Sequence, residues 1–292
     1  MVSSYGASSL KINLGLIGNA ISKSRAPSLH KFLGKLHGID VSYTLFDPIT
    51  SDSASFARQL AELIDQGIDG CNVTFPFKQI ALELIDKPDK ACVLVGSTNT
   101  IRLGSETSST NTDYSGFIRA LRTKLDGEQA GSTLIMGAGG VGRAVAFGIA
   151  SMSSSTINIF DPSIERAKQL MNALCAAGFS AQTVDSSNLA EISQHVDGIL
   201  NCSPIGHYQT PGLPIEASLI GPQKWAFDAV YTPLQTEFIQ ECRRSEISII
   251  SGFELFFYQG LDSFEFWTGI EADEHRVRQA FLLVSGIDPT EI

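Results

Sequence analysis

A glycine-rich turn between two apolar segments has the clearest chemistry in this sequence. Gly137, Gly139 and Gly142 have the spacing G-x-G-x-x-G, directly after the apolar run 133–136 and before the helical pattern 143–150. The first glycine permits a tight bend, the second lets the backbone approach a pyrophosphate, and the third lets helix and strand pack closely. The following helix N-terminus offers N–H groups and positive dipole charge to phosphates. The pattern predicts a dinucleotide site; the alternatives are a purely structural turn or another nucleoside cofactor, such as S-adenosylmethionine.

An acidic residue at the end of the next strand indicates which dinucleotide binds. Asp161 lies 19 residues beyond Gly142, close to the expected spacing of about 20. Its carboxylate can accept hydrogen bonds from both ribose hydroxyls of NAD, and it would repel the 2′-phosphate of NADP unless a cation intervened. We therefore expect NAD rather than NADP, unless Asp161 only caps the next helix. The predicted cofactor-binding residues are Gly137, Ala138, Gly139, Gly140, Val141, Gly142, Asp161, Arg166 and Gly252.

Polar residues in the first half of the chain form a second candidate site. Lys78 follows Pro76 at the start of a predicted helix, where a positive charge opposes the helix dipole. Small polar residues also cluster at 97–100 and 111–113. The alternative is that Lys78 is a solvated surface residue and that the clusters are ordinary turns and helix caps.

The elements that must position these residues alternate between helical and strand patterns, which predicts an α/β fold. Strands are expected at 11–18, 41–47, 69–75 and 99–103, with helices at 24–39, 55–67 and 77–85. The polar segment 104–113 is predicted to be a hairpin tip or a hinge. Beyond a helix near 117–121, six strands (132–136, 156–161, 180–184, 197–203, 224–231, 247–251) predict a mostly parallel, doubly wound sheet. We predict two domains, 1–113 plus 253–292 and 114–252 (Rossmann-type), because the terminal helices can return to the first.

Composition and charge limit the function classes. Hydrophobic residues make up 43% of the 292 residues, and the formal net charge is −10. This composition forms a core, and the acidic balance argues against binding to nucleic acid or to anionic membranes. No apolar run has the length of a membrane span, and we expect no signal peptide at the N-terminus. Five scattered cysteines without a CxxC pair suggest a reducing, cytoplasmic compartment, and five dispersed histidines predict no metal site.

Taken together, the motifs resemble the shikimate/quinate dehydrogenase family along nearly the whole chain. The matching segments are GLIGNAISKSRAPSLH, DGCNVTFPFKQ, VGSTNTI, NTDYSGF, GAGGVGRAVA, FDAVYTPLQT and FELFFYQG. The resemblance implies an NAD-dependent oxidoreductase with a substrate-binding domain and a dinucleotide domain, acting on a small hydroxylated ring carboxylic acid. It implies a monomer or a homodimer.

The resemblance also implies the substrate-site residues. The catalytic pair of the family matches Lys78 and Asp113, where a lysine can take or give the hydroxyl proton as hydride moves. The alternative is a salt bridge that only positions substrate while the proton passes through water. Neutral side chains that hold ring hydroxyls match Thr74, Asn99 and Gln259, with Asn72 a weaker candidate. Ser24 and Tyr231 match groups that meet the ring carboxylate. His30, His207 and the phenylalanines at 253, 256 and 257 are expected to be structural or loop residues.

One departure from the family pattern concerns the ring carboxylate. The family has Ser-x-Ser-Pro where this chain has Ser24-Arg25-Ala26-Pro27, so one hydroxyl donor is missing at Ala26. Losing a hydrogen bond to a charged group costs about 1.5–3 kcal/mol unless Ser22 or Arg25 replaces it. Together with Asp161, this version resembles the NAD-using quinate/shikimate branch. Quinate carries an extra ring hydroxyl, and a smaller residue could make room for it.

Three alternatives follow from the same residues. The chain could act on a related cyclitol acid such as an aminoshikimate. It could be a non-catalytic protein that senses a dinucleotide or a cyclitol acid, which the missing hydroxyl at Ala26 slightly favours and the intact Lys78 and Asp113 oppose. A dehydrogenase for a folate adduct fits the segments NTDYSG and YTP less well.

Overall fold

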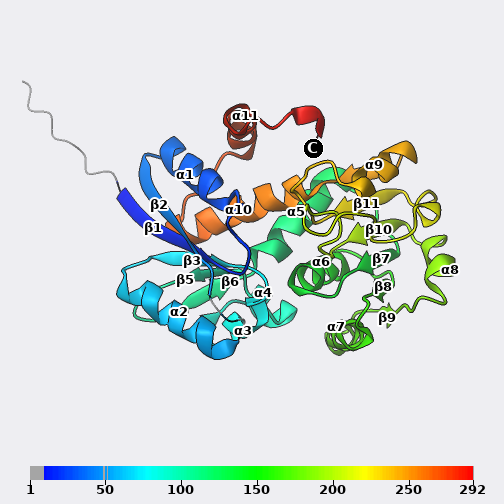
Figure 1. The fold of residues 1–292 in the computed structure, drawn as a ribbon, viewed down its shortest axis with the longest axis horizontal. Coiled ribbons are helices and arrows are strands. Elements are labelled where there is room, and N and C mark those ends of the chain that lie inside the picture. Colours follow the sequence, from blue (N-terminus) through cyan, green and yellow to red (C-terminus); the bar gives the residue numbers. More distant parts are fainter. Residues whose placement is uncertain (1–9, 49, 51, 292) are drawn as a thin grey trace, which may run out of the picture. The chain divides into compact units, whose positions relative to one another are not determined.

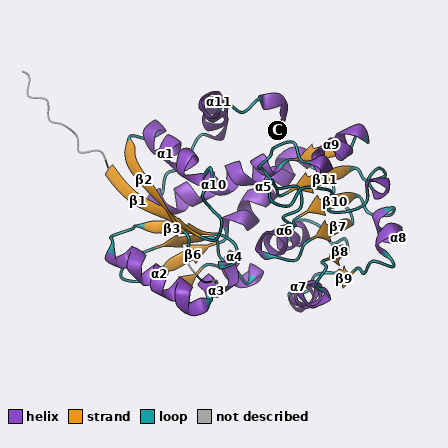
Figure 2. Cartoon of the chain, viewed as in Figure 1, coloured by secondary structure: helices purple, strands orange, loops and turns teal. Residues whose placement is uncertain are grey.

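The computed structural model describes residues 10–48, 50 and 52–291. The predicted absence of a signal peptide concerns a segment whose first nine residues lie outside this range. Helices and strands alternate along the chain (Figure 2), which confirms the α/β class. Contacts divide the chain into two compact units. The first comprises Met1–Cys92, Ser97–Thr110 and Ser263–Ser285, and the second comprises Val93–Gly96, Asn111–Asp262 and Gly286–Ile292. The predicted domain boundaries at 113/114 and 252/253 stay predictions.

The first unit is built on a mixed sheet with the strand order β2-β1-β3-β5-β6-β4. Its strands are β1 (Leu10–Ile17), β2 (Ile39–Phe46), β3 (Gly70–Val73), β4 (Lys87–Pro88), β5 (Thr100–Arg102) and β6 (Ser108–Thr110). β1 pairs with β2 and β3 in parallel, whereas β5 pairs with β3 and β6 antiparallel. The segment 104–113 therefore contains the turn and the second strand of a β-hairpin, one of the two structures that its polar sequence predicted.

Helices cover both faces of this sheet. Figure 1 shows α1 (Ala26–Leu36) on one side and α2 (Ser53–Asp65) on the other. α1 has proline in its first turn, and Gly38 with φ +70° follows its end, as the sequence indicated. α2 begins at Asp52, whose carboxylate accepts from Ser55 N at 2.8 Å, and with α3 (Lys78–Leu82) it buries Phe56, Phe77 and strand residues in one apolar core. The unit also contains α11 (Glu274–Ser285) and the end of α10 (Gly252–Thr268).

The second unit contains the predicted doubly wound sheet. Its strands are β7 (Thr133–Met136), β8 (Ile157–Phe160), β9 (Ala181–Thr183), β10 (Gly198–Asn201), β11 (Trp225–Asp228) and β12 (Ser248–Ile250). All neighbours are parallel in the order β12-β11-β10-β7-β8-β9. This is the dinucleotide-fold order 3-2-1-4-5-6, with its crossover between β7 and β10. Ligands in such sheets bind beyond the carboxyl ends of the strands at this crossover.

Helices connect the strands of the second unit. They are α5 (Thr112–Leu125), α6 (Gly140–Ala150), α7 (Ile164–Ala176), α8 (Leu189–Ser193), α9 (Glu237–Arg244), the first part of α10, and the 3-10 turns η1 (Ala217–Leu219) and η2 (Pro289–Glu291). α6 has a nearly continuous apolar sequence, and most of its side chains are buried. A helix that is apolar on nearly all sides is buried in the protein interior. The helix after the glycine turn is therefore held by packing on most of its surface.

One segment has structure that the sequence analysis did not predict. Residues 87–95 form β4 and the helix α4 (Lys90–Val95). β4 has two residues and pairs only with β6, too short for a periodicity to appear. α4 begins beyond Pro88, where Asp89 accepts a hydrogen bond from Cys92 N at 2.8 Å. The predicted helix at 77–85 is shorter in the structure, ending at Leu82.

Candidate active site

The glycine-rich turn joins β7 to the N-terminus of α6. Gly137 has φ +104°, and a Cβ at Gly142 would lie 1.9 Å from the carbonyl oxygen of Gly137. These two positions therefore admit only glycine. Apart from the neighbouring backbone, no atom of the described residues lies within 4 Å of a Cβ added at Gly139. Open space in front of a helix N-terminus fits the pyrophosphate of a dinucleotide.

Asp161 lies next to this turn, at the end of β8, and is 7% exposed. Its Oδ2 accepts from Ala138 N at 2.8 Å, and its Oδ1 accepts from Ser163 N at 2.8 Å. Arg166 Nη2 donates to the same Oδ1 at 3.0 Å, while the Arg166 side chain stays 57% exposed. The helix cap is Ser163, whose hydroxyl accepts from Arg166 N at 3.4 Å. Asp161 thus ties the glycine turn to the end of β8.

A buried carboxylate at the ends of β10 and β11 was missed by the sequence analysis. Asp228 is fully buried, and its Oδ1 accepts from Asn201 Nδ2 at 2.9 Å and Val230 N at 3.0 Å. Its Oδ2 accepts from Thr236 Oγ1 at 2.5 Å. Burial outweighs these three hydrogen bonds and raises the pKa of Asp228 to about 7. The available signal was an acidic residue ending an apolar strand, as at Asp161.

Three further predicted residues lie in, or pack against, the loops that follow β10 and β11. Tyr231, three residues on, stacks on Phe256 with ring centroids 5.0 Å apart. A Cβ at Gly252 would lie 2.6 Å from the carbonyl oxygen of Val230, so glycine is needed for α10 to begin against this loop. His207 lies in the loop after β10, where its Nδ1 accepts from Gln209 N at 3.2 Å.

In the first unit, Lys78 is 7% exposed although it begins a helix. Its carbonyl oxygen accepts from Thr98 N at 2.8 Å, and Asn99 O accepts from Val73 N at 2.8 Å. Asn99 is 3% exposed. Thr74 follows β3, and its methyl group occupies the space where Gly18 has no side chain, since a Cβ there would lie 2.2 Å away. The structure thus brings the segments of Lys78, Thr74 and Asn99 together at the end of β3.

A buried hydrogen-bond network surrounds Asn99. The Tyr43 hydroxyl lies 2.7 Å from Asn72 Oδ1 and donates to it, which orients the amide so that Asn72 Nδ2 faces Thr100 Oγ1 and Ser263 Oγ, both at 3.1 Å. Thr100 and Ser263 hydroxyls lie 2.9 Å apart, and Thr100 Oγ1 donates to Asn99 Oδ1 at 3.2 Å. Asn72, the weaker candidate, is therefore a link in the network that orients Asn99.

His30 lies beside this network and is fully buried. Its ring stacks on Tyr43 at 5.2 Å and meets Trp267 edge-on at 5.1 Å. Neither ring nitrogen makes a hydrogen bond of normal geometry with any residue that the structure describes. Burial lowers the pKa of His30 to about 3, although the neighbouring Asn72 side chain raises it by less. His30 is thus a neutral packing residue, in keeping with the structural role expected from the sequence.

Ser24, which keeps the family's first hydroxyl, and Ala26, which lacks the second, lie where α1 begins. Ser24 Oγ accepts from Ala26 N at 3.3 Å, and the Ser24 side chain is half-buried. Ala26 is 8% exposed. Ser22 is exposed, and Arg25 is half-buried like Ser24. The replacement of the absent hydroxyl by Ser22 or Arg25 stays a prediction.

Asp113 and Gln259 lie on α5 and α10 in the second unit. Asp113 is 6% exposed in the first turn of α5, where a carboxylate is favourable to the helix dipole. Gln259 Nε2 donates to Phe256 O at 2.9 Å. A Cβ at Gly116 would lie 2.7 Å from Gln259 N, so the two helices are in backbone contact there. Because Lys78 belongs to the first unit, its pairing with Asp113 stays a prediction.

Among the described residues there is neither a group of metal ligands nor a candidate membrane span. Within 10–48, 50 and 52–291, no three acidic, histidine or cysteine side chains are grouped as metal ligands. Over the same residues, no helix is both long and apolar enough to span a bilayer.

Two family models match the chain. Residues 16–101 match the shikimate dehydrogenase substrate binding domain, and residues 252–280 match the shikimate 5'-dehydrogenase C-terminal domain. A quinate/shikimate dehydrogenase (NAD(+)) from Corynebacterium efficiens is 33% identical over 279 residues, which is 93% of this chain and 98% of that protein. A shikimate dehydrogenase (NADP(+)) from Pseudarthrobacter chlorophenolicus is 31% identical over 92% of this chain and 94% of its own.

Solved structures share the fold over almost the whole chain. Quinate dehydrogenase from Corynebacterium glutamicum in complex with NAD has a TM-score of 0.85 and 30% identity, covering 94% of this chain and 99% of that one. The Thermus thermophilus shikimate 5-dehydrogenase in complex with NADP(H) and shikimate has a TM-score of 0.80 and 26% identity, covering 92% and 98%.

Proposed function

Because the chain belongs to the shikimate dehydrogenase family, we propose that it is an oxidoreductase that transfers a hydride between NAD and a ring hydroxyl of shikimate or quinate. The observation that carries the proposal is Lys78, a charged side chain only 7% exposed at the start of a helix. Lysine is almost never buried without a partner or a function, and here it lies with Thr74 and Asn99, which suit a hydroxylated ring.

In this proposal, Lys78 transfers the proton of the reacting hydroxyl. When NAD is bound, it would accept the hydride that leaves the ring carbon. As the hydride leaves, the neutral amine of Lys78 accepts the hydroxyl proton and becomes an ammonium group, and in the reverse direction this ammonium group protonates the ketone oxygen. Asp113 is the carboxylate that orients the ammonium group and holds its geometry.

Recognition of the ring uses neutral groups for hydroxyls and separate groups for the carboxylate. Thr74, Asn99 and Gln259 donate and accept hydrogen bonds without adding charge. Ser24 and Tyr231 meet the ring carboxylate. Because Ala26 contributes no donor, the remaining contacts supply a larger part of the binding free energy. The smaller side chain also leaves room for the additional ring hydroxyl of quinate.

The preference for NAD follows from Asp161. Its carboxylate is held in place by two backbone N–H groups and by Arg166. In this position it accepts from ribose hydroxyls and opposes a 2′-phosphate. Arg166 is occupied with Asp161 rather than directed to a phosphate, which supports NAD over NADP.

The test is the rate of formation of the reduced nicotinamide with shikimate and quinate, each with NAD and NADP. We expect turnover of at least one acid with NAD and a kcat/KM ratio that favours NAD. Asp161→Asn keeps an acceptor but removes the charge, so the NAD/NADP ratio should fall. A wild-type preference for NADP would contradict the cofactor assignment.

The same assay separates the competing functions. Turnover of an aminoshikimate in preference to both acids would move the substrate class to a related cyclitol acid. Tight binding of NAD and a ring acid, measured by calorimetry, with no turnover of any acid would indicate a sensing protein.

A further inference from the structure

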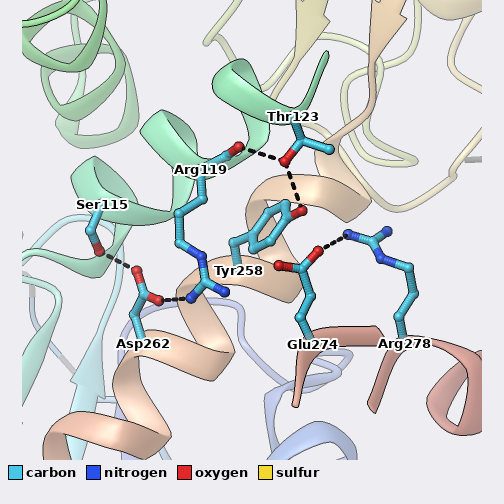
Figure 3. A network of polar contacts seen from close by, with 7 residues as sticks. All are labelled: Ser115, Arg119, Thr123, Tyr258, Asp262, Glu274 and Arg278. Atoms are coloured by element: carbon cyan, nitrogen blue, oxygen red, sulfur yellow. Dashed lines mark hydrogen bonds and ion pairs between the residues drawn. The ribbon is translucent and has the colours of Figure 1, made fainter. Parts of the chain in front are cut away.

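A set of polar contacts joins α5 to α10 close to Asp113 and Gln259. Asp262 Oδ2 accepts a hydrogen bond from the Ser115 hydroxyl, and its Oδ1 pairs with Arg119 Nη1 (Figure 3). The Arg119 guanidinium lies 4.8 Å from the centroid of the Tyr258 ring. The Tyr258 and Thr123 hydroxyls lie 3.2 Å apart. We call these five residues the α5–α10 clasp.

The clasp surrounds the point where the two backbones touch. Gly116 lies between Ser115 and Arg119 along α5, and a Cβ there would lie 2.7 Å from Gln259 N and 3.1 Å from Gln259 Cα. On α10, Tyr258 precedes Gln259 in the sequence and Asp262 follows it by three residues. Side chains three and four residues apart share a helix face, so Asp113 and Gln259 both belong to the contacting faces.

The chemistry of the clasp fixes α10 in one register. Asp262 receives a charged donor and a hydroxyl donor from one helix face, and charge-assisted bonds of this kind are among the stronger polar contacts. The Asp262 side chain is 14% exposed and that of Arg119 34%, so the pair is screened less than a surface pair. A helix that slips by one residue moves 1.5 Å along its axis and turns by about 100°, which would remove Gln259 from its place.

We propose that Asp262, with Ser115 and Arg119, is a positioning residue that sets Gln259 relative to Asp113 for binding of the ring acid. The inference rests on the proposed function, since it assigns Gln259 to a ring hydroxyl and Asp113 to Lys78. Asp262 does not touch substrate. Its effect is on the ring acid and not on the dinucleotide. The glycine turn lies between β7 and α6, and Gly252, at the start of α10, packs against the carbonyl oxygen of Val230 rather than against the clasp.

The experiment compares Asp262→Ala, Asp262→Asn and Gly116→Ala with the wild-type enzyme. Asp262→Ala removes both contacts, Asp262→Asn keeps the shape without the charge, and Gly116→Ala pushes the backbones apart while favouring the helix by up to about 1 kcal/mol. We expect kcat/KM for the ring acid to fall about 10- to 100-fold in Asp262→Ala and Gly116→Ala, the cost of misplacing a binding group by about 1 Å. KM for NAD should be unchanged, and Asp262→Asn should be intermediate.

The matched control is Glu241→Ala, which breaks the Glu241–Arg244 pair on α9. It should leave KM for the ring acid at the wild-type value. If folded Asp262→Ala and Gly116→Ala keep wild-type KM and kcat and lose only thermal stability, the clasp is structural and the inference is wrong. If Asp262→Ala does not fold, Asp262→Asn and Gly116→Ala decide in the same way. A wild-type enzyme that neither binds nor turns over a ring acid would overturn the proposed function, and this inference with it.

Discussion

Replacing His30 tests whether its ring is buried and neutral in the folded protein. His30→Phe keeps an aromatic ring between Tyr43 and Trp267 but has nothing to protonate. In the wild type, burial lowers the pKa of His30 from 6.5 to about 3. Between these pH values the unfolded chain binds a proton that the folded chain does not. The free energy of unfolding therefore decreases as the pH falls through this window.

The size of the effect follows from the difference between the two pKa values. Each pH unit inside the window is worth about 1.4 kcal/mol. From pH 7 to pH 5, the single proton at His30 should lower the wild-type free energy of unfolding by about 2 kcal/mol relative to His30→Phe. Above pH 7 the difference between the two proteins should be constant.

Urea unfolding at pH 7, 6 and 5, followed by tryptophan fluorescence, measures this difference. Trp267 meets His30 edge-on at 5.1 Å and so reports on the same unit. We expect the wild-type and variant curves to separate as the pH falls. If the two free energies change in parallel from pH 7 to pH 5, His30 is not a buried neutral side chain and the description of this core is wrong.

Three further predictions follow from named contacts. Burial raises the pKa of Asp228 to about 7, so the contribution of Asp228 to the free energy of unfolding falls as the pH rises from about 4 to 7. In the same urea series, the free energy of unfolding of Asp228→Asn should rise by about 2 kcal/mol relative to that of the wild type between pH 5 and pH 7. A difference that does not change with pH would contradict this. Thr100→Val removes the donor to Asn99 and should raise KM for the ring acid about fivefold, about 1 kcal/mol, while Thr100→Ser restores it; equal KM values in both variants would refute the orienting role. Gly142→Ala places a Cβ 1.9 Å from a carbonyl oxygen and should weaken NAD binding at least about tenfold by calorimetry, whereas wild-type affinity would show that the turn does not hold the dinucleotide.

The parts of the fold that the sequence predicted are those with a periodic or positional signal. The six strands of the second unit are short runs separated by helices or, between β10 and β11, by a loop with the 3-10 turn η1, and their parallel order is confirmed. The roles of Gly137 and Gly142 follow from spacing alone because they concern local backbone geometry. The two-residue strand β4 and the six-residue α4 have too few residues for either period to appear.

Contacts between distant segments could not be predicted from the sequence. Asn72 meets Ser263, 191 residues away, and Asp262 meets Ser115, 147 residues away. No local pattern marks such pairs. Asp228 was missed for a related reason, because a carboxylate that ends a buried strand is notable only when its donors from Asn201 and Thr236 are known. Family resemblance named Asp113 and Gln259, but the packing of their helices required coordinates.

The turnover number of Lys78→Ala at saturating NAD and ring acid, beside that of the wild type, tests whether Lys78 transfers the proton. We propose that the buried Lys78 side chain at the start of α3 takes and returns the proton of the reacting hydroxyl. We predict that kcat falls by at least about 100-fold, the usual contribution of a general acid or base, with NAD affinity unchanged by calorimetry. A variant that turns over at close to the wild-type rate would contradict the account.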